Sequence, residues 1–111
     1  MEHNYSKTEV RTWVQETVKN IFKGEIEESI KSNIKITFDY DDEDGFWAST
    51  IVVRQWLNGK WEICDYFFFY SYYGNYWELV TKPWVGEMID DITDEVMKFI
   101  HQPKKKEFEY G

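Results

Sequence analysis

The dipeptide Asn58-Gly59 constrains the fold most, because it lies between two runs of β-branched and aromatic residues. Asn-Gly suits the two central positions of a type I′ turn, which makes it the strongest short-range indication of a β-hairpin. The flanking runs therefore predict two antiparallel strands, one over residues 46–57 and one from residue 60 to about residue 72.

Three further segments complete the predicted sheet. Residues 34–41 alternate between apolar and polar side chains, which is the two-residue period of a half-buried strand. The segment Asp42-Glu43-Asp44-Gly45 provides the turn into the next strand. Gly74-Asn75 predicts a second tight turn, followed by a short fourth strand over residues 76–80. Residues 25–33 are ambiguous, and their isoleucine spacing favours one short helical turn.

Helices are predicted at both ends of the chain. Ser6 to Glu9 has the form of a capping box, and apolar residues then recur at helical spacing until Gly24, a natural stop. Pro83 suits the first position of a closing helix with its own apolar stripe. We therefore expect residues 1–111 to form a single α+β domain, with helix, antiparallel sheet of three or four strands, and helix in that order. Both helices would pack on one sheet face, and residues 1–5 and 103–111 would fray.

A two-residue turn at Asn58-Gly59 would place large rings on both faces of the sheet. The more continuous apolar set is the predicted core face: Trp47, Ile51, Val53, Cys64, Tyr66, Phe68, Tyr70, Tyr72, Trp77 and Leu79. The other face would expose Arg54, Trp56, Trp61, Phe67 and Phe69. Aromatic residues with arginine are the usual anchors of protein interfaces, so we interpret this set as partner-binding. A helix on each side of the sheet, or a homodimer, would also cover it.

The charge is strongly acidic, with 21 acidic residues against 13 basic ones and a net charge of -8. Such a charge argues against direct binding to nucleic acid or to an anionic membrane, and it attracts a basic protein; it could also serve only solubility. The acids concentrate in one predicted turn and in the closing helix, and the candidate partner-binding acids are Asp41, Asp42, Glu43, Asp44, Glu87, Asp90, Asp91, Asp94 and Glu95. In the closing helix, like charges at i, i+3 and i+4 spacing repel one another.

Motifs for catalysis or metal binding are missing from the sequence. The single cysteine excludes an internal disulfide and a cysteine zinc site, and both histidines, His3 and His101, lie near the chain ends. The acidic run from Asp39 does not have the spacing of a calcium-binding EF-hand loop, and no glycine-rich phosphate loop is present. The chain has no signal peptide or membrane-spanning run. We therefore expect a cytoplasmic protein that is not an enzyme and needs no metal or cofactor.

The element order on a small, strongly acidic chain resembles phage-encoded inhibitors, including some anti-CRISPR proteins and other DNA mimics. The resemblance spans the whole layout and rests on the order of elements and on the acids named above. It implies carboxylates that stand where phosphates would and occupy a basic groove of the target. The order also resembles double-stranded-RNA-binding domains, but Trp84 and acids replace their basic helix start, which excludes that function.

The leading hypothesis is a stoichiometric inhibitor that blocks a basic, nucleic-acid-binding enzyme through the acidic turn and the acidic closing helix. A second hypothesis is an immunity protein that neutralises a basic toxin. A third is an acidic homodimeric secretion chaperone that holds an unfolded segment on the aromatic face. A small-molecule enzyme or binding module is disfavoured because the sequence offers neither a cofactor motif nor a credible general base.

Overall fold

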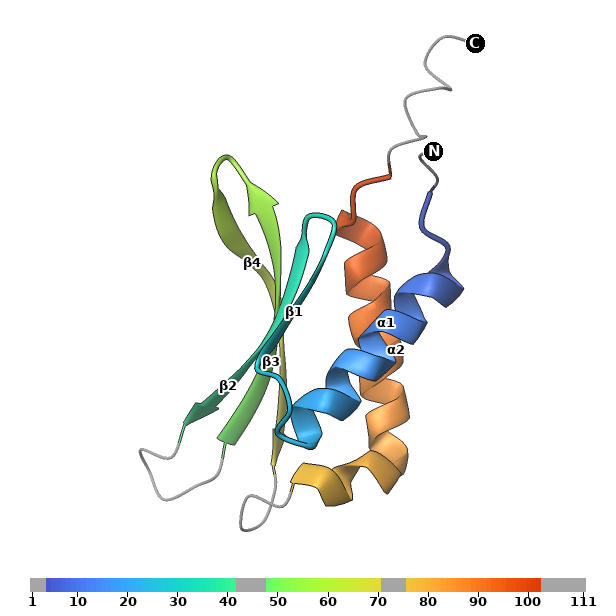
Figure 1. Ribbon diagram of the computed structural model, residues 1–111, viewed down its shortest axis with the longest axis vertical. Helices are drawn as coiled ribbons and strands as arrows, with labels where there is room; N and C mark the ends of the chain where they lie inside the picture. Colours follow the sequence, from blue (N-terminus) through green and yellow to red (C-terminus); the bar gives the residue numbers. More distant parts are fainter. Residues whose placement is uncertain (1–3, 42–47, 71–75, 103–111) are drawn as a thin grey trace, which may run out of the picture.

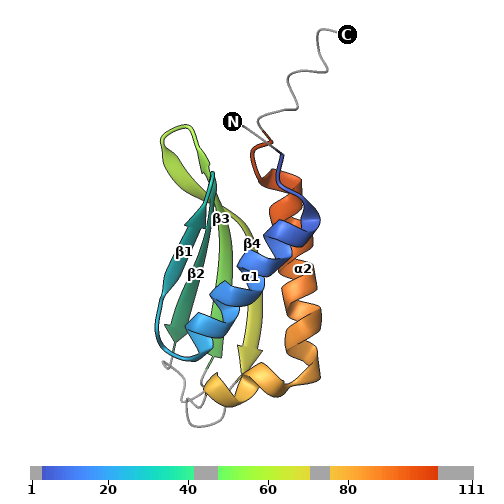
Figure 2. The same cartoon turned by 45° about the vertical axis from the view of Figure 1, so that its right-hand side comes forward.

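The computed structural model describes residues 4–41, 48–70 and 76–102. Its elements are, in order, α1 (Lys7–Phe22), β1 (Glu28–Lys31), β2 (Ile34–Asp41), β3 (Ala48–Leu57), β4 (Lys60–Tyr70), the 3₁₀ helix η2 (Tyr76–Thr81) and α2 (Pro83–Phe99). The four strands form one antiparallel sheet in the order β1-β2-β3-β4. Both helices cover the same face of this sheet (Figures 1 and 2), so the predicted α+β class and element order are confirmed.

The ends of α1 follow the sequence prediction. The backbone N–H of Glu9 donates to Oγ of Ser6 at 3.1 Å, as a capping box requires. Gly24 follows the helix with a φ of 76°, a left-handed conformation that glycine adopts without a steric cost. Its N–H donates to the carbonyl of Ile21 at 3.0 Å, which satisfies one of the carbonyls left open at the helix end.

The fourth strand of the sheet is not the predicted one. Residues 76–81 form η2, and the fourth strand is β1, which lies in the segment expected to form a helical turn. Lys31 pairs with Ile34, so Ser32 and Asn33 form a two-residue hairpin turn in which Ser32 has a φ of 55°. Non-glycine residues seldom adopt a positive φ, and this turn contains no glycine that would have marked it in the sequence.

The predicted Asn-Gly hairpin forms, but a β-bulge changes the pairing of β4 beyond its first residues. The pairs nearest the turn, from Leu57 with Lys60 to Arg54 with Ile63, are those that a two-residue turn at Asn58-Gly59 produces. The next pair is Val53 with Asp65, so Cys64 is an extra residue on β4. Because strand side chains alternate between the two faces, this one extra residue exchanges the faces of all later β4 residues.

Because of the bulge, the β4 residues that follow it lie on the opposite faces of the sheet from those predicted. Phe69 is buried and Phe67 packs partly buried against the core, so these two residues do not belong to the exposed aromatic face. Tyr66 and Phe68, which we expected in the core, are exposed instead. Of the other predicted core residues, Ile51, Val53 and Leu79 are buried and Cys64 packs partly buried against them. Trp47 and Tyr72 lie outside the described residues, as do the side chains of Tyr70 and Trp77.

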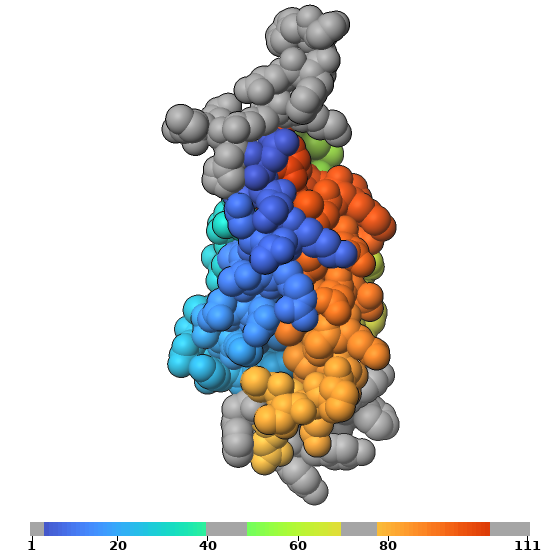
Figure 3. Space-filling view, turned by 90° about the vertical axis from the view of Figure 1, so that its right-hand side faces the viewer, coloured from blue at the N-terminus to red at the C-terminus, as the bar shows by residue number. Residues whose placement is uncertain are grey.

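The core lies between the sheet and the two helices. Buried side chains of α1 and α2, including Val14 and Ile92, meet those of β2 and β3, including Ile36 and Ile51. Figure 3 shows the outer side of this layer, where α1 and α2 lie side by side. With α1 and α2 both on this side, no helix of the described residues lies over the opposite face of the sheet (Figure 1).

The chain ends are tied together just outside the helices. The backbone N–H of Tyr5 donates to Oε1 of Gln102 at 2.7 Å, and Nε2 of Gln102 donates to the carbonyl of Tyr5 at 3.1 Å. The Tyr5 ring also packs against the core, with the ammonium of Lys31 5.1 Å from its centroid. Tyr5 is therefore held in place, although we expected it in a frayed tail; residues 1–3 and 103–111 lie outside the described residues.

Candidate functional site

The candidate site is the sheet face opposite the helices, which we call the open face. Strand register assigns to it Glu28, Ile30, Lys35, Thr37, Asp39, Thr50, Val52, Arg54, Trp56, Trp61, Ile63, Tyr66 and Phe68. Val52 is buried among its neighbours but is not part of the core cluster on the helix side, as this assignment requires. Arg54, Trp56 and Trp61 therefore lie on the face on which the sequence placed them.

Large apolar side chains are unusually exposed on the open face. The exposed fractions are 53% for Ile30, 48% for Trp56, 46% for Ile63, 48% for Tyr66 and 70% for Phe68. If a large side chain presents ~150 to 250 Å² when fully exposed, these five alone leave roughly 400 to 650 Å² of accessible area. That much apolar area on one face is comparable to the largest apolar patches of typical monomers, and such patches commonly mark interaction sites.

Ring contacts order this patch. The centroids of Trp56 and Trp61 lie 5.2 Å apart in an edge-to-face arrangement. The rings of Tyr66 and Phe68 stack with centroids 5.9 Å apart. Rings that already hold one another in a fixed arrangement lose less side-chain entropy when a partner covers them.

The charged side chains of the open face neutralise one another. Arg54 donates a hydrogen bond to Oγ1 of Thr37 and lies 3.8 Å from a carboxylate oxygen of Asp39. Lys35 lies 3.7 Å from a carboxylate oxygen of Glu28, and its ammonium is 4.6 Å from the centroid of the Trp61 ring. Two cations and two carboxylates therefore balance on this face, and its binding energy would come mainly from apolar contact.

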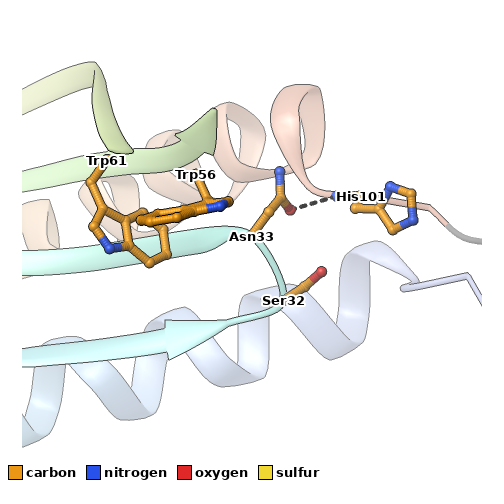
Figure 4. Close-up of a pocket in the computed structure, with 5 residues that line it drawn as sticks. All are labelled: Ser32, Asn33, Trp56, Trp61 and His101. Atoms are coloured by element: carbon orange, nitrogen blue, oxygen red, sulfur yellow. Dashed lines mark hydrogen bonds between the residues drawn. The ribbon is translucent and has the colours of Figure 1, made fainter. Parts of the chain in front are cut away.

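A shallow pocket of about 500 Å³ adjoins the tryptophan end of the open face (Figure 4). It is lined by Ser32, Asn33, Trp56, Trp61 and His101, which come from the β1–β2 turn, the β3–β4 hairpin and the residues after α2. Asn33 holds the residues after α2 against the β1–β2 turn. Its Nδ2 donates to the carbonyl of Phe99 at 3.0 Å, and its Oδ1 accepts from the N–H of His101 at 2.7 Å. The pocket is thus built from three parts of the chain.

The pocket brings together a serine and a histidine, but not a catalytic arrangement. Within the described residues, no hydrogen bond orients the imidazole of His101. Nucleophilic catalysis requires a base that is hydrogen-bonded to the nucleophile and is itself oriented by a third group. The geometry supports a binding surface better than an active site.

The acids of α2 have basic partners that the sequence did not reveal. Nε of Arg11 on α1 lies 2.7 Å from Oδ1 of Asp90, and Nζ of Lys7 lies 3.0 Å from Oδ1 of Asp94. Glu95 accepts a hydrogen bond of 2.8 Å from Lys98 within α2. The apparent one-sign helix therefore lies beside a second helix that supplies the opposite charge.

The remaining candidate acids are less constrained by the structure. Glu87 and Asp91 are exposed, and in the described part of the chain no basic side chain forms an ion pair with either. Asp42, Glu43 and Asp44 lie outside the described residues, and of Asp41 only the strand backbone is described. Of the candidate acids, the structure therefore places only the side chains on α2.

Cys64 is a free, partly buried thiol at the bulge of β4. Burial raises the pKa of this thiol above its ordinary value, and the nearby carboxylates of Glu95 and Asp65 raise it further. A thiol of raised pKa is a poor nucleophile at neutral pH, so this environment is typical of a structural cysteine.

Sequence reasoning missed three residues of the site, Ile30, Tyr66 and Phe68, and did not single out Ile63, although the predicted pairing already placed it opposite Arg54. The run from Tyr66 to Tyr70 is aromatic at every position, so its hydrophobicity cannot show which residues face the core. The extra residue at Cys64 alone determines which residues of this run face the core, and nothing in the local sequence marks a bulge there.

The described residues contain neither a metal-ligand cluster nor a membrane-spanning helix. Across residues 4–41, 48–70 and 76–102, no three His, Cys, Asp or Glu side chains group as metal ligands. In the same ranges, no helix is both long and apolar enough to cross a membrane. Comparison of the chain with protein-family models, with curated proteins and with solved structures found no match.

Proposed function

We propose that this protein is a stoichiometric inhibitor that binds a basic, nucleic-acid-binding enzyme and contacts it through the open face of the sheet. The observation that carries the proposal is the exposure of Ile30, Trp56, Ile63, Tyr66 and Phe68 on the face opposite α1 and α2. Aromatic anchors at the centre of a surface with a polar rim are typical of protein interfaces.

The net charge of -8 favours a basic partner. Because the charges of the open face balance locally, the excess acid acts from outside the contact, as a field that steers a basic protein toward the domain. Exposed acids outside the open face, such as Glu25 and Glu27 before β1, contribute to that field. Enzymes that bind nucleic acid carry basic surfaces, so a domain seated on such a surface would exclude the substrate.

The contact surface in this proposal differs from the one expected from the sequence. Asp90 and Asp94 are paired with cations of α1, and therefore they present less free charge to a partner than their sequence spacing indicates. The open face takes the place of α2 as the main source of affinity. The same surface would serve an immunity protein, and the identity of the captured partner separates these two inhibitors.

The proposal is tested by capturing partners on the immobilised protein at low and at moderate salt, followed by identification with mass spectrometry. We expect a basic nucleic-acid-binding protein that releases its DNA or RNA when one equivalent of the domain is added. Capture of a protein that still binds nucleic acid normally in the complex would overturn the proposal. A stable homodimer in sedimentation that buries the aromatic rings would instead favour the chaperone hypothesis.

A further inference from the structure

Strand β4 is a long edge strand. It spans 11 residues and pairs only with β3, so within the described residues no strand pairs with its outer edge. Such an edge presents a row of backbone N–H and C=O groups that can pair with another extended chain. Native proteins usually protect edges of this length with bulges or with charged side chains.

The bulge protects only the middle of β4. Next to it, the backbone N–H of Tyr66 donates to Oδ1 of Asp65 at 2.8 Å, so a side chain satisfies this amide. Amides of a strand alternate in direction, and those of Phe68 and Tyr70 are therefore directed to the same outer edge as that of Tyr66. From Tyr66 to Tyr70 the pairing with β3 is regular, so this segment of the edge is not interrupted by a further bulge.

One flank of α2 places acids beside this segment. Trp84, Asp91 and Glu95 recur at helical spacing, and the Trp84 ring lies 6.1 Å from that of Phe69 on β4. Glu95 is also close enough to Cys64 to raise the pKa of its thiol, after the larger effect of burial. The helix side of the β4 edge therefore carries three acids, Asp65, Asp91 and Glu95, against one cation, Lys98, which pairs with Glu95. The opposite side carries the exposed rings of Tyr66 and Phe68.

We propose that the outer edge of β4 over residues 66–70 binds an extended segment of the partner protein as a fifth strand. Side chains of an added strand alternate between the two faces. Those on the helix side would meet Asp65, Asp91 and Glu95, and those on the open side would meet Tyr66 and Phe68. The segment would therefore alternate basic and apolar residues.

A second copy of this chain is a poorer occupant of the same edge. Two copies paired through β4 would bring the acids Asp65, Asp91 and Glu95 of each chain toward one another, and like charges across an interface oppose association. The choice of a basic partner rests on the proposed function, but the strand-addition geometry can be tested without knowing that partner.

The test uses a synthetic nine-residue peptide that alternates lysine and valine, added to the full-length protein. The control is the same peptide methylated on every second backbone nitrogen, which keeps its charges and side chains but removes the donors that pair with an edge. The readout is amide hydrogen exchange by NMR at Phe68 and Tyr70. We expect both amides to exchange several-fold more slowly with the unmodified peptide and to be unaffected by the methylated one.

Two double variants with equal net charge test the acidic flank. Asp91→Asn with Glu95→Gln removes the acids beside β4, and Asp90→Asn with Asp94→Asn removes acids on the α1 side of the same helix. We expect the first pair to weaken peptide binding by about threefold to tenfold and the second pair to change it by less than about twofold. Equal effects of the two pairs, or equal protection by the methylated peptide, would overturn the inference.

The outcomes also separate this inference from the proposed function. Trp56 lies on the open face of β3 and not at the β4 edge. If Trp56→Ala loses partner binding and the peptide does not protect the amides of Phe68 and Tyr70, the proposed function is supported and strand addition at the β4 edge is overturned. If the peptide protects these amides and Trp56→Ala binds the partner normally, strand addition at the β4 edge is supported and the open face is overturned as the contact surface.

Discussion

At the scale of single residues, the bulge at Cys64 gives two adjacent phenylalanines opposite environments. Phe69 is 4% exposed and contacts Phe22 edge to face with centroids 5.2 Å apart, whereas Phe68 is 70% exposed. We predict that Phe69→Ala lowers the free energy of unfolding by about 3 to 5 kcal/mol, because it leaves a cavity in the core. Phe68→Ala should change it by no more than about 0.5 kcal/mol.

Urea denaturation of both variants measures this difference directly. The two substitutions remove the same atoms from neighbouring positions, so each variant is the control of the other. Equal losses, or a larger loss in Phe68→Ala, would mean that β4 follows the bulge-free register expected from the sequence.

The same bulge explains which part of the site could be predicted. The positions of Trp56 and Trp61 follow from the Asn-Gly turn alone, because turn length fixes the pairing of the nearest residues. The positions of Tyr66 and Phe68 do not, since the extra residue lies between them and the turn. Apolar periodicity cannot recover the phase of a run in which every residue from Tyr66 to Tyr70 is aromatic.

The thiol of Cys64 should titrate at a higher pH in the folded protein than in the unfolded chain. Burial is the main cause of its raised pKa, followed by the carboxylates of Glu95 and Asp65. We predict that the pH midpoint of its alkylation rate falls when the protein is unfolded in urea, and falls only in part in Glu95→Gln, which leaves burial unchanged.

The raised pKa of Cys64 also makes the free energy of unfolding depend on pH. As pH rises, the thiol of the unfolded chain loses its proton first, at an ordinary pKa of about 8.5. The stabilisation that the Cys64 thiol contributes to the folded state is therefore complete below that pH and is lost as pH rises through the pKa of the folded state. Alkylation with the same pH midpoint in the folded and unfolded states would contradict the described environment of Cys64.

At the scale of elements, local sequence determines the helices and the central hairpin but not the rest of the sheet. The capping box of α1, Pro83 of α2 and the Asn-Gly turn each act within a few residues, and all three are found where predicted. Strand β1 depends instead on pairing with β2 across a turn in which Ser32 has a positive φ. Tertiary pairing therefore overrides the local helical preference of that segment.

The two helices also show why the acids of α2 were misjudged as an unpaired row. Their partners Lys7 and Arg11 lie about 80 residues away in sequence. We predict that Asp90→Asn and Asp94→Asn each lower the free energy of unfolding by at most about 1 kcal/mol, because exposed ion pairs contribute little. Both losses should shrink as salt is added, since salt screens exposed charges.

Asp91→Asn is the matched control for these variants. Asp91 is exposed on the same helix and has no ion pair with another described residue, so its removal should leave stability unchanged or slightly improved. Thermal unfolding at low and at high salt measures the three variants together. A loss of several kcal/mol in Asp90→Asn, or no difference from Asp91→Asn at low salt, would contradict the described pairs.

At the scale of the whole molecule, the structure separates long-range charge from short-range contact. The helix layer pairs several of its acids internally, and the open face balances two cations against two carboxylates. In the part of the chain that the structure describes, much of the acid on these two surfaces is therefore paired, while the net charge over the full sequence is -8. Added salt should then slow association with a basic partner more than it speeds dissociation, because the contact itself is apolar.

The most direct test of the central claim is the calorimetric affinity of the captured basic partner for two double variants. Trp56→Ala with Phe68→Ala removes two anchors of the open face, and Asp90→Asn with Asp94→Asn removes two acids of α2. The open face predicts that the first variant loses about thirtyfold or more in affinity, as aromatic hot spots of about 2 kcal/mol do, while the second stays within a few-fold of the unaltered protein. Unchanged affinity in the aromatic variant, with loss in the acid variant, would contradict the open face and favour charge mimicry by α2.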